Sequence, residues 1–232
     1  MKVNAGERKP MPWNIPNLLT ISRVLAAPLF GLVFVVFWSP LADWIALVLF
    51  IVAALTDYLD GYLARKWNQT SAFGKMLDPI ADKAMVMIAL LILSLKFGGD
   101  MLIVIPVIAI YFREVLVSGM REFMGTDAAR LSVTKLAKWK TATQMIAVIL
   151  LLGYLILAHY VWAQTIGMSP EIIAEIMDGK LDDMFGLRWK MPLHEYGLWI
   201  ATGVLWLAAL LTLITGWDYF HKTLPILRER DQ

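Results

Sequence analysis

The sequence has no cysteine and unusually little charge. The absence of cysteine excludes disulfide and thiol chemistry. Charged residues make up 17% of the 232 positions, against about 25% in a soluble domain, while 59% of the residues are hydrophobic. Internal repeats and low-complexity linkers are also absent. Together, the shortage of charge and the apolar excess predict an integral membrane protein.

Six apolar windows are long enough to cross a hydrocarbon core of ~30 Å, which takes about 20 helical residues. They lie at 17–38, 42–63, 78–97, 101–122, 141–163 and 196–217. Lipid cannot satisfy exposed backbone groups, so each span must be a helix or part of a closed barrel, and unbroken apolar runs favour helices. The sequence therefore predicts an all-α polytopic membrane protein, with one bundle of six transmembrane helices over 17–222.

The distribution of Lys and Arg predicts the orientation of this bundle. If the spans alternate, most basic residues fall on the side that holds both termini, and the positive-inside rule places that side in the cytoplasm. We expect residues 1–16 and 223–232 to be cytoplasmic, with the first span an anchor helix. The far side carries a long connection, 164–194, which could contain a short amphipathic helix. Its Asp182–Asp183 pair is expected to face water.

Four aspartates interrupt the apolar pattern. Asp57 lies about 12 Å below the expected cytoplasmic end of the second span, counting 1.5 Å per residue, and a carboxylate at that depth must face protein, water or a cation. Asp57 and Asp60 share a helix face, as do Asp78 and Asp82 at the start of the third span. We therefore expect four carboxylates to converge at one depth.

Two readings explain such a cluster. Carboxylates this close neutralise one another by taking up protons unless a cation lies among them, and all-oxygen ligation favours Mg²⁺ or Mn²⁺. Alternatively, the aspartates form ion pairs at the membrane interface with Arg65, Lys66, Lys75 and Lys83. Gly61 and Ala64, on the acidic face, favour the first reading, because small residues clear a slot that ion pairing does not need.

The spacing of these residues resembles a family signature. From Asp57 to Asp82 the chain reads D-x2-D-G-x2-A-R-x8-G-x3-D-x3-D, eight fixed residues over 26 positions, and it is similar at every spacing to the signature of the CDP-alcohol phosphatidyltransferase family. The resemblance implies a six-helix membrane enzyme, usually homodimeric, that transfers a phosphatidyl or related group from a CDP-linked donor to an alcohol and releases CMP. Membrane lipids are further expected partners, and nucleic acid is not.

The resemblance also implies roles for individual residues. It makes Asp57, Asp60 and Asp78 ligands of two divalent ions, Mg²⁺ or Mn²⁺, and makes Asp82 a further ligand or the catalytic base. Around the CDP-diacylglycerol headgroup it places Asp60, Gly61, Ala64, Arg65 and Gly74. The chemistry is coherent, because metals can neutralise a diphosphate while a carboxylate takes the proton of the attacking hydroxyl.

Two further regions indicate the acceptor. NIPNLLTISRVLAAP at 14–28 and REVLVSGMREFMG at 113–125, followed by KLAKWKTATQ, resemble bacterial members of the family that use sn-glycerol 3-phosphate. They imply a bacterial cytoplasmic (inner) membrane, with the active site facing the cytoplasm.

A basic collar supports a phosphorylated acceptor. Arg113 lies with Glu114 inside an apolar span, where an ionisable pair suggests function, and we take it as the only base so placed on this side. Arg121, Lys138 and Lys140 complete the predicted phosphate site. Alternatively, Lys140 is an ordinary positive-inside residue that contacts anionic lipid.

Other functions stay open at this point. Within the family, phosphatidylinositol-phosphate synthase and a CDP-type cardiolipin synthase are alternatives. An intramembrane prenyltransferase also uses aspartate clusters, but without the D-G-x2-A-R run. A cation transporter could place four aspartates on two helices, although broken helices near the bilayer midplane are more typical of that class.

Overall fold

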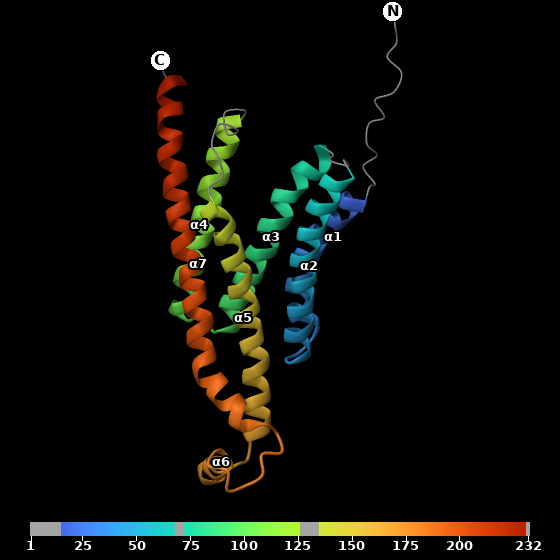
Figure 1. Ribbon diagram of the computed structural model, residues 1–232, viewed down its shortest axis with the longest axis vertical. Helices are drawn as coiled ribbons and strands as arrows, with labels where there is room; N and C mark the ends of the chain where they lie inside the picture. The colour runs from blue at the N-terminus through green and yellow to red at the C-terminus, as the bar shows by residue number, and fades with distance from the viewer. Residues whose placement is uncertain (1–14, 68–71, 126–134, 231–232) are drawn as a thin grey trace, which may run out of the picture.

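The computed structural model describes residues 15–67, 72–125 and 135–230, and the regular elements within these ranges are all helical (Figure 1). The helices are α1 (Ile15–Val36), α2 (Leu41–Lys66), α3 (Ala72–Lys96), α4 (Met101–Met124), α5 (Lys135–Thr165), α6 (Pro170–Met177) and α7 (Leu187–Arg230). The predicted all-α fold is thus confirmed for the described part of the chain.

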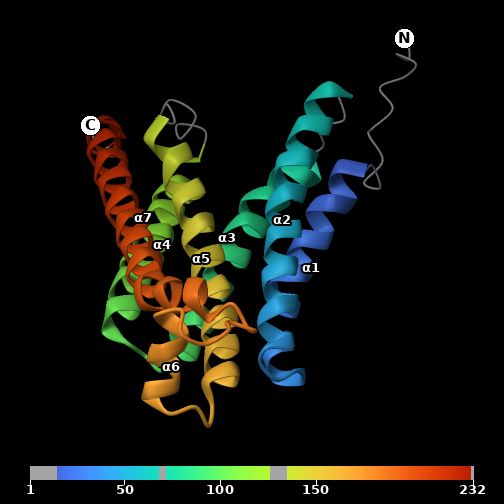
Figure 2. The same ribbon diagram turned by 60° about the horizontal axis from the view of Figure 1, so that its bottom comes forward.

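The long helices form two groups. Helices α1, α2 and α3 pack together, and α4 and α5 both pack along α7. Contacts of α5 with α2 and α3, and of α3 with α4, join the two groups. The start of α1 and the end of α7 lie toward one end of the molecule, whereas α6 lies at the other (Figures 1 and 2). This arrangement agrees with termini on one side and the 164–194 connection on the other.

The helix boundaries follow the predicted spans closely, with three differences. Helix α5 begins at Lys135, six residues before the predicted fifth span. Helix α3 begins at Ala72, six residues before the predicted third span, so Asp78 lies within its second turn. Helix α7 has 44 residues, about 66 Å of helix at 1.5 Å per residue, and extends beyond the predicted window 196–217 at both ends. The last span is therefore much longer than its apolar core.

By length and composition, four of the described helices, α1, α4, α5 and α7, are able to cross a membrane. Helices α2 and α3 are comparably long, at 26 and 25 residues, but they carry the aspartates of the motif. The chain is accordingly an integral membrane protein. The count of six spans stays a prediction.

The outer surface of the bundle suits lipid. Large apolar side chains are exposed along the long helices, among them Leu29, Val48 and Ile108. The six tryptophans expected at the membrane interface are all exposed, at positions Trp38, Trp44, Trp67, Trp139, Trp162 and Trp217. Apolar exposure on this scale would be unusual in a soluble protein and is ordinary for a surface that faces acyl chains.

Small residues allow α7 to approach α5 closely. The small residues Ala201, Ala208 and Thr212 share one face of α7 with Leu205, at intervals of three or four positions, and all four are buried. The hydroxyl of Thr212 accepts a hydrogen bond of 3.0 Å from the Gln144 amide of α5, which shows that this face points at α5. Without a hydrophobic driving force between helices in lipid, such close packing and polar contacts hold the bundle together.

The far-side connection is ordered by its own caps. The predicted amphipathic helix is confirmed as α6, with Ser169 as its N-cap and Pro170 in its first turn. The expectation that Asp183 simply faces water is wrong, because its carboxylate accepts the backbone N–H groups of Leu187 (2.6 Å) and Arg188 (2.9 Å) at the start of α7. The N–H of Arg188, aided by that of Leu187, holds the pKa of Asp183 below its usual value.

We expect Ala208→Leu to separate α5 from α7 and to lower the free energy of unfolding by about 1–3 kcal/mol, the usual cost of overpacking. The thermal midpoint in detergent measures this effect. Gly203→Leu is the matched control, because Gly203 is an exposed α7 position at which an added Cβ meets nothing within 4 Å. An equal loss in both variants would contradict the assignment of this face to close packing.

Candidate functional site

Three of the four predicted aspartates meet at one arginine. The Nη1 atom of Arg23, on α1, lies 2.5 Å from Asp57 Oδ1 on α2 and 2.5 Å from Asp82 Oδ1 on α3. Its Nη2 atom lies 3.7 Å from Asp78 Oδ1. The predicted convergence is therefore confirmed for Asp57, Asp78 and Asp82. The side chain of Asp60 lies outside the described residues.

Helix periodicity explains this meeting. Thr20 and Arg23 are three positions apart on α1, so both side chains face the same neighbours. The Thr20 hydroxyl donates a 2.8 Å hydrogen bond to Asp78 Oδ1, beside the Arg23 contact. Asp78 and Asp82, four apart on α3, present both carboxylates to α1. The first helix, which the sequence analysis did not include in the site, therefore orients the aspartates of the other two.

The net charge of Arg23 and its three aspartates favours the binding of a cation. Three carboxylates and one guanidinium carry a formal net charge of −2, counted over the ion pairs of Arg23. The aspartate side chains are 35–48% exposed, whereas that of Arg23 is 4% exposed. Hard oxygen donors with this residual charge fit a divalent ion such as Mg²⁺. Within the described residues, no three acidic, His or Cys side chains are grouped closely enough to hold a metal. Arg23 Nη1 lies within 2.5 Å of both Asp57 and Asp82.

The residues predicted to contact the donor lie where α2 ends and α3 begins. Gly61, Ala64 and Arg65 fall in the last turns of α2, and the side chains of Ala64 and Arg65 lie outside the described residues. Gly74 is buried in the first turn of α3. The structure thus places these positions beside the aspartates along the chain but does not describe their contacts with a headgroup.

A cavity of about 360 Å³ lies beside the aspartates, between α3, α4 and α5. Two aspartates and three of the predicted phosphate ligands line it, namely Asp78, Asp82, Arg113, Arg121 and Lys140. The sequence could not show that bases of α4 and α5 share a space with acids of α3. The fourth predicted phosphate ligand, Lys138, has a side chain that lies outside the described residues.

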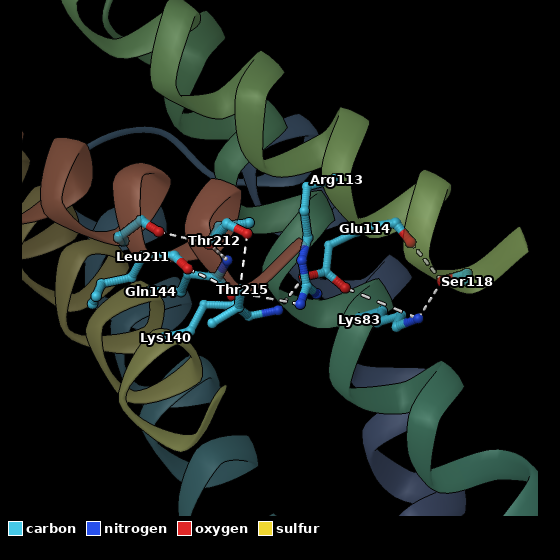
Figure 3. Close-up of polar contacts among 10 residues, drawn as sticks. Lys83, Arg113, Glu114, Ser118, Lys140, Gln144, Leu211, Thr212 and Thr215 are labelled. Carbon is cyan, nitrogen blue, oxygen red and sulfur yellow. Dashed lines mark hydrogen bonds and ion pairs between the residues drawn. The ribbon is translucent and has the colours of Figure 1, made fainter. Parts of the chain in front are cut away.

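Glu114 joins the bases of this cavity (Figure 3). Its Oε1 atom accepts from Arg113 Nη1 at 3.1 Å and also from the ammonium of Lys140. Its Oε2 atom lies 3.9 Å from Lys83 Nζ, on α3. Arg113, Glu114 and Lys140 are each 7–8% exposed. The alternative interpretation of Lys140 as a residue that contacts lipid is therefore wrong, because the residue is buried against Glu114.

Arg121 differs from the other bases. It is exposed in the last turn of α4, and its guanidinium lies 5.4 Å from the ring centre of Tyr219 on α7. A cation over an aromatic face is held without losing its charge. Because Arg121 lines the cavity and is itself exposed, it lies at the rim of the cavity.

Sequence reasoning missed Arg23. The expectation that Arg113 is the only base within an apolar span on this side is wrong, because Arg23 lies within the first predicted span and is buried. The available signal was a single arginine inside an otherwise apolar helix, the same signal that identified Arg113. Lys83 was considered only as an interfacial ion-pair partner.

Comparison with known proteins gives the family. The family model described as CDP-alcohol phosphatidyltransferase matches residues 13–174. The chain is 49% identical over 219 residues to a CDP-diacylglycerol–glycerol-3-phosphate 3-phosphatidyltransferase of Cereibacter sphaeroides, covering 94% of this chain and 99% of that protein. Proteins of the same name from Rickettsia bellii and Shigella flexneri are each 39% identical, over 89% and 72% of this chain and 93% and 90% of their own lengths. With most of its length matched by the family model and by these relatives, the chain belongs to the CDP-alcohol phosphatidyltransferase family.

Proposed function

We propose that this protein transfers the phosphatidyl group from CDP-diacylglycerol to sn-glycerol 3-phosphate, giving phosphatidylglycerophosphate and CMP. Relatives that are named for this activity match nearly the whole length of the chain. The observation that supports it most directly is the shared cavity, in which Asp78 and Asp82 lie with Arg113 and Lys140. A reaction between a diphosphate lipid and a phosphorylated alcohol needs both sets of charges in one place.

In this proposal Asp82 is the base. It lines the cavity and is held in position by Arg23. The acceptor hydroxyl gives its proton to an Asp82 oxygen while its own oxygen bonds to the phosphorus that carries the diacylglycerol. The bond between that phosphorus and the oxygen bridging to CMP breaks, and CMP leaves with that oxygen. The bases across the cavity hold the acceptor's phosphate away from the aspartates.

The proposed metal ligands are Asp57, Asp60, Asp78 and Asp82. Bound there, two ions such as Mg²⁺ or Mn²⁺ would neutralise the diphosphate oxygens and stabilise the charge of the departing CMP. The formal charge of −2 left by Arg23 and its three aspartates supports this assignment. Asp60, Gly61, Ala64, Arg65 and Gly74 are the proposed contacts of the donor headgroup.

The proposed setting is a bacterial cytoplasmic membrane crossed six times, with α2 and α3 as the two further spans. Both termini of the chain and the site then face the cytoplasm, where the basic residues concentrate. Asp57, Asp78 and Asp82 face Arg23, and Asp78 and Asp82 also line the cavity, which makes their presence in membrane helices tolerable. A homodimer is part of the proposal by family resemblance.

The competing functions differ in product or in acceptor. A cation transporter would use the aspartates but would release no CMP. Other members of the family would release CMP with an inositol phosphate or with phosphatidylglycerol as acceptor. The deciding experiment incubates purified protein with CDP-diacylglycerol and each acceptor in turn and measures CMP and the lipid product. Preference for any acceptor other than sn-glycerol 3-phosphate would overturn the proposal.

The first prediction from the proposed function concerns the metal. We expect excess chelator to abolish CMP release and added Mg²⁺ or Mn²⁺ to restore it, because the carboxylates would otherwise repel the diphosphate of the donor. CMP release is measured before and after readdition of the ion. Full turnover in excess chelator would contradict the metal assignment.

The second prediction separates ligands from base. Asp57→Asn and Asp78→Asn should each raise the metal concentration that gives half-maximal rate, because each removes a ligand charge. Asp82→Asn should lower kcat by about 100-fold or more while retaining more donor binding than turnover, as expected on removal of a general base. The readouts are CMP release against Mg²⁺ concentration and the binding of CDP-diacylglycerol. A near-normal kcat in Asp82→Asn would show that another group takes the proton.

The third prediction concerns the acceptor phosphate. Arg113→Lys keeps the charge but loses the planar fork that matches a phosphate. We expect the KM for sn-glycerol 3-phosphate to rise about 10-fold or more, an effect of at least about 1.4 kcal/mol, while the KM for CDP-diacylglycerol hardly changes. Steady-state kinetics with each substrate varied in turn test this, and an unchanged acceptor KM would remove Arg113 from the site.

A further inference from the structure

We propose that Glu114 is the positioning residue of the acceptor site, and that Lys83 joins Arg113 and Lys140 in binding the acceptor phosphate. This inference deepens the proposed function and rests on it. The observations that carry it are the geometry, burial and charge of one cluster at the wall of the 360 Å³ cavity.

Three helices bring their bases to a single carboxylate (Figure 3). Arg113 and Lys140 both donate to Oε1 of Glu114, and Lys83 lies 3.9 Å from Oε2. The bases come from α4, α5 and α3 respectively, so no local sequence pattern links them. The donors of three cations converge on one carboxylate. Phosphate oxygens bind to convergent donors of the same kind, so these cations are already placed to bind a phosphate.

The same carboxylate keeps these cations charged. Lys140 is 7% exposed, and an ammonium so far from water remains ionised only where an anion compensates it. Glu114 is the only acidic partner of Lys140 in the described part of the chain. Without Glu114, the ammonium of Lys140 would have no anion beside it and would not be held where it can bind a phosphate.

Hydroxyl groups hold two of the bases in position without neutralising their charge. Arg113 Nη2 donates to the hydroxyl of Thr215 on α7 at 3.2 Å, and Lys83 donates to the hydroxyl of Ser118 on α4. A hydroxyl fixes the position of a cation but leaves its charge for a ligand. The bases are therefore ordered before an acceptor arrives, which reduces the ordering cost of binding.

The remaining charge matches the predicted acceptor. Three cations and one carboxylate carry a formal net charge of +2, and a phosphomonoester carries about −1.5 to −2 at pH 7. Binding of such a phosphate would neutralise the cluster, whereas a neutral alcohol such as glycerol would leave it charged. The three bases thereby select a phosphorylated acceptor, and Glu114 contributes by holding them in place.

The test compares Glu114→Gln with the wild-type protein, using sn-glycerol 3-phosphate and glycerol as acceptors. We expect the KM for sn-glycerol 3-phosphate to rise at least about 10-fold, and the preference for it over glycerol in kcat/KM to fall by a similar factor. The KM for CDP-diacylglycerol should stay within about twofold, because the donor contacts lie elsewhere. A purely structural role would instead lower stability and impair both substrates together.

Glu122→Gln is the matched control. Glu122 is exposed on the same helix, and the structure shows no ion pair between it and the described bases. It should behave as wild type. If Glu114→Gln does not fold, Glu114→Asp tests the same point, since it keeps the charge but withdraws it by one methylene and should raise the acceptor KM several-fold.

A double variant tests whether Glu114 acts through Lys140. Lys140→Met alone should raise the acceptor KM. In the double variant with Glu114→Gln, the total increase in the acceptor KM should be smaller than the product of the two single increases. Effects that simply multiply would overturn the coupling. An unchanged acceptor KM in both Glu114 variants would overturn the whole inference. By contrast, wild-type protein that forms no product from sn-glycerol 3-phosphate would overturn the proposed function itself.

Discussion

The contact of Arg23 with three aspartates is the interaction on which the acidic half of the site depends. Asp57 and the pair Asp78 and Asp82 come from different helices, and like charges on neighbouring helices would push α2 and α3 apart. A guanidinium from α1, 4% exposed and within 2.5 Å of two of the carboxylates, removes that conflict. It also leaves enough negative charge for the divalent ions proposed here. The first helix is thus part of the site as well as a membrane anchor.

The second half of the site follows the same physical rule with the signs reversed. One buried acid, Glu114, gathers bases from three helices, just as Arg23 gathers acids from two. The cavity between these clusters has a residual negative charge on one wall and a residual positive charge on the other. A metal-bound diphosphate and a phosphate-bearing alcohol suit such opposed walls. In the proposed reaction, this separation would keep the acceptor's phosphate away from Asp82, which would take the proton of the acceptor hydroxyl.

The packing of α7 keeps the basic cluster in place. Thr215 accepts from Arg113, and Thr212, one turn earlier, accepts from Gln144 of α5. Gly216 allows the Arg113 side chain to cross the surface of α7, because a Cβ there would lie 2.6 Å from Arg113 Cγ. The small and hydroxylated residues of one helix therefore serve both close packing and the position of a charged side chain.

The sequence by itself determined the class of protein, the helices and the acidic residues of the site. Apolar length fixes where a membrane helix can lie, and helix periodicity fixes which aspartates share a face, so both are properties of neighbouring residues. The signature beginning at Asp57 identified the family because it too is a pattern of residues close together in the sequence. Only the tertiary structure decided which charges meet. It placed Arg23 among the aspartates, Lys83 beside Glu114, and Lys140 inside the bundle. Each of these contacts joins side chains far apart in the chain, and in a membrane interior a charge is stable only beside a partner that packing brings to it.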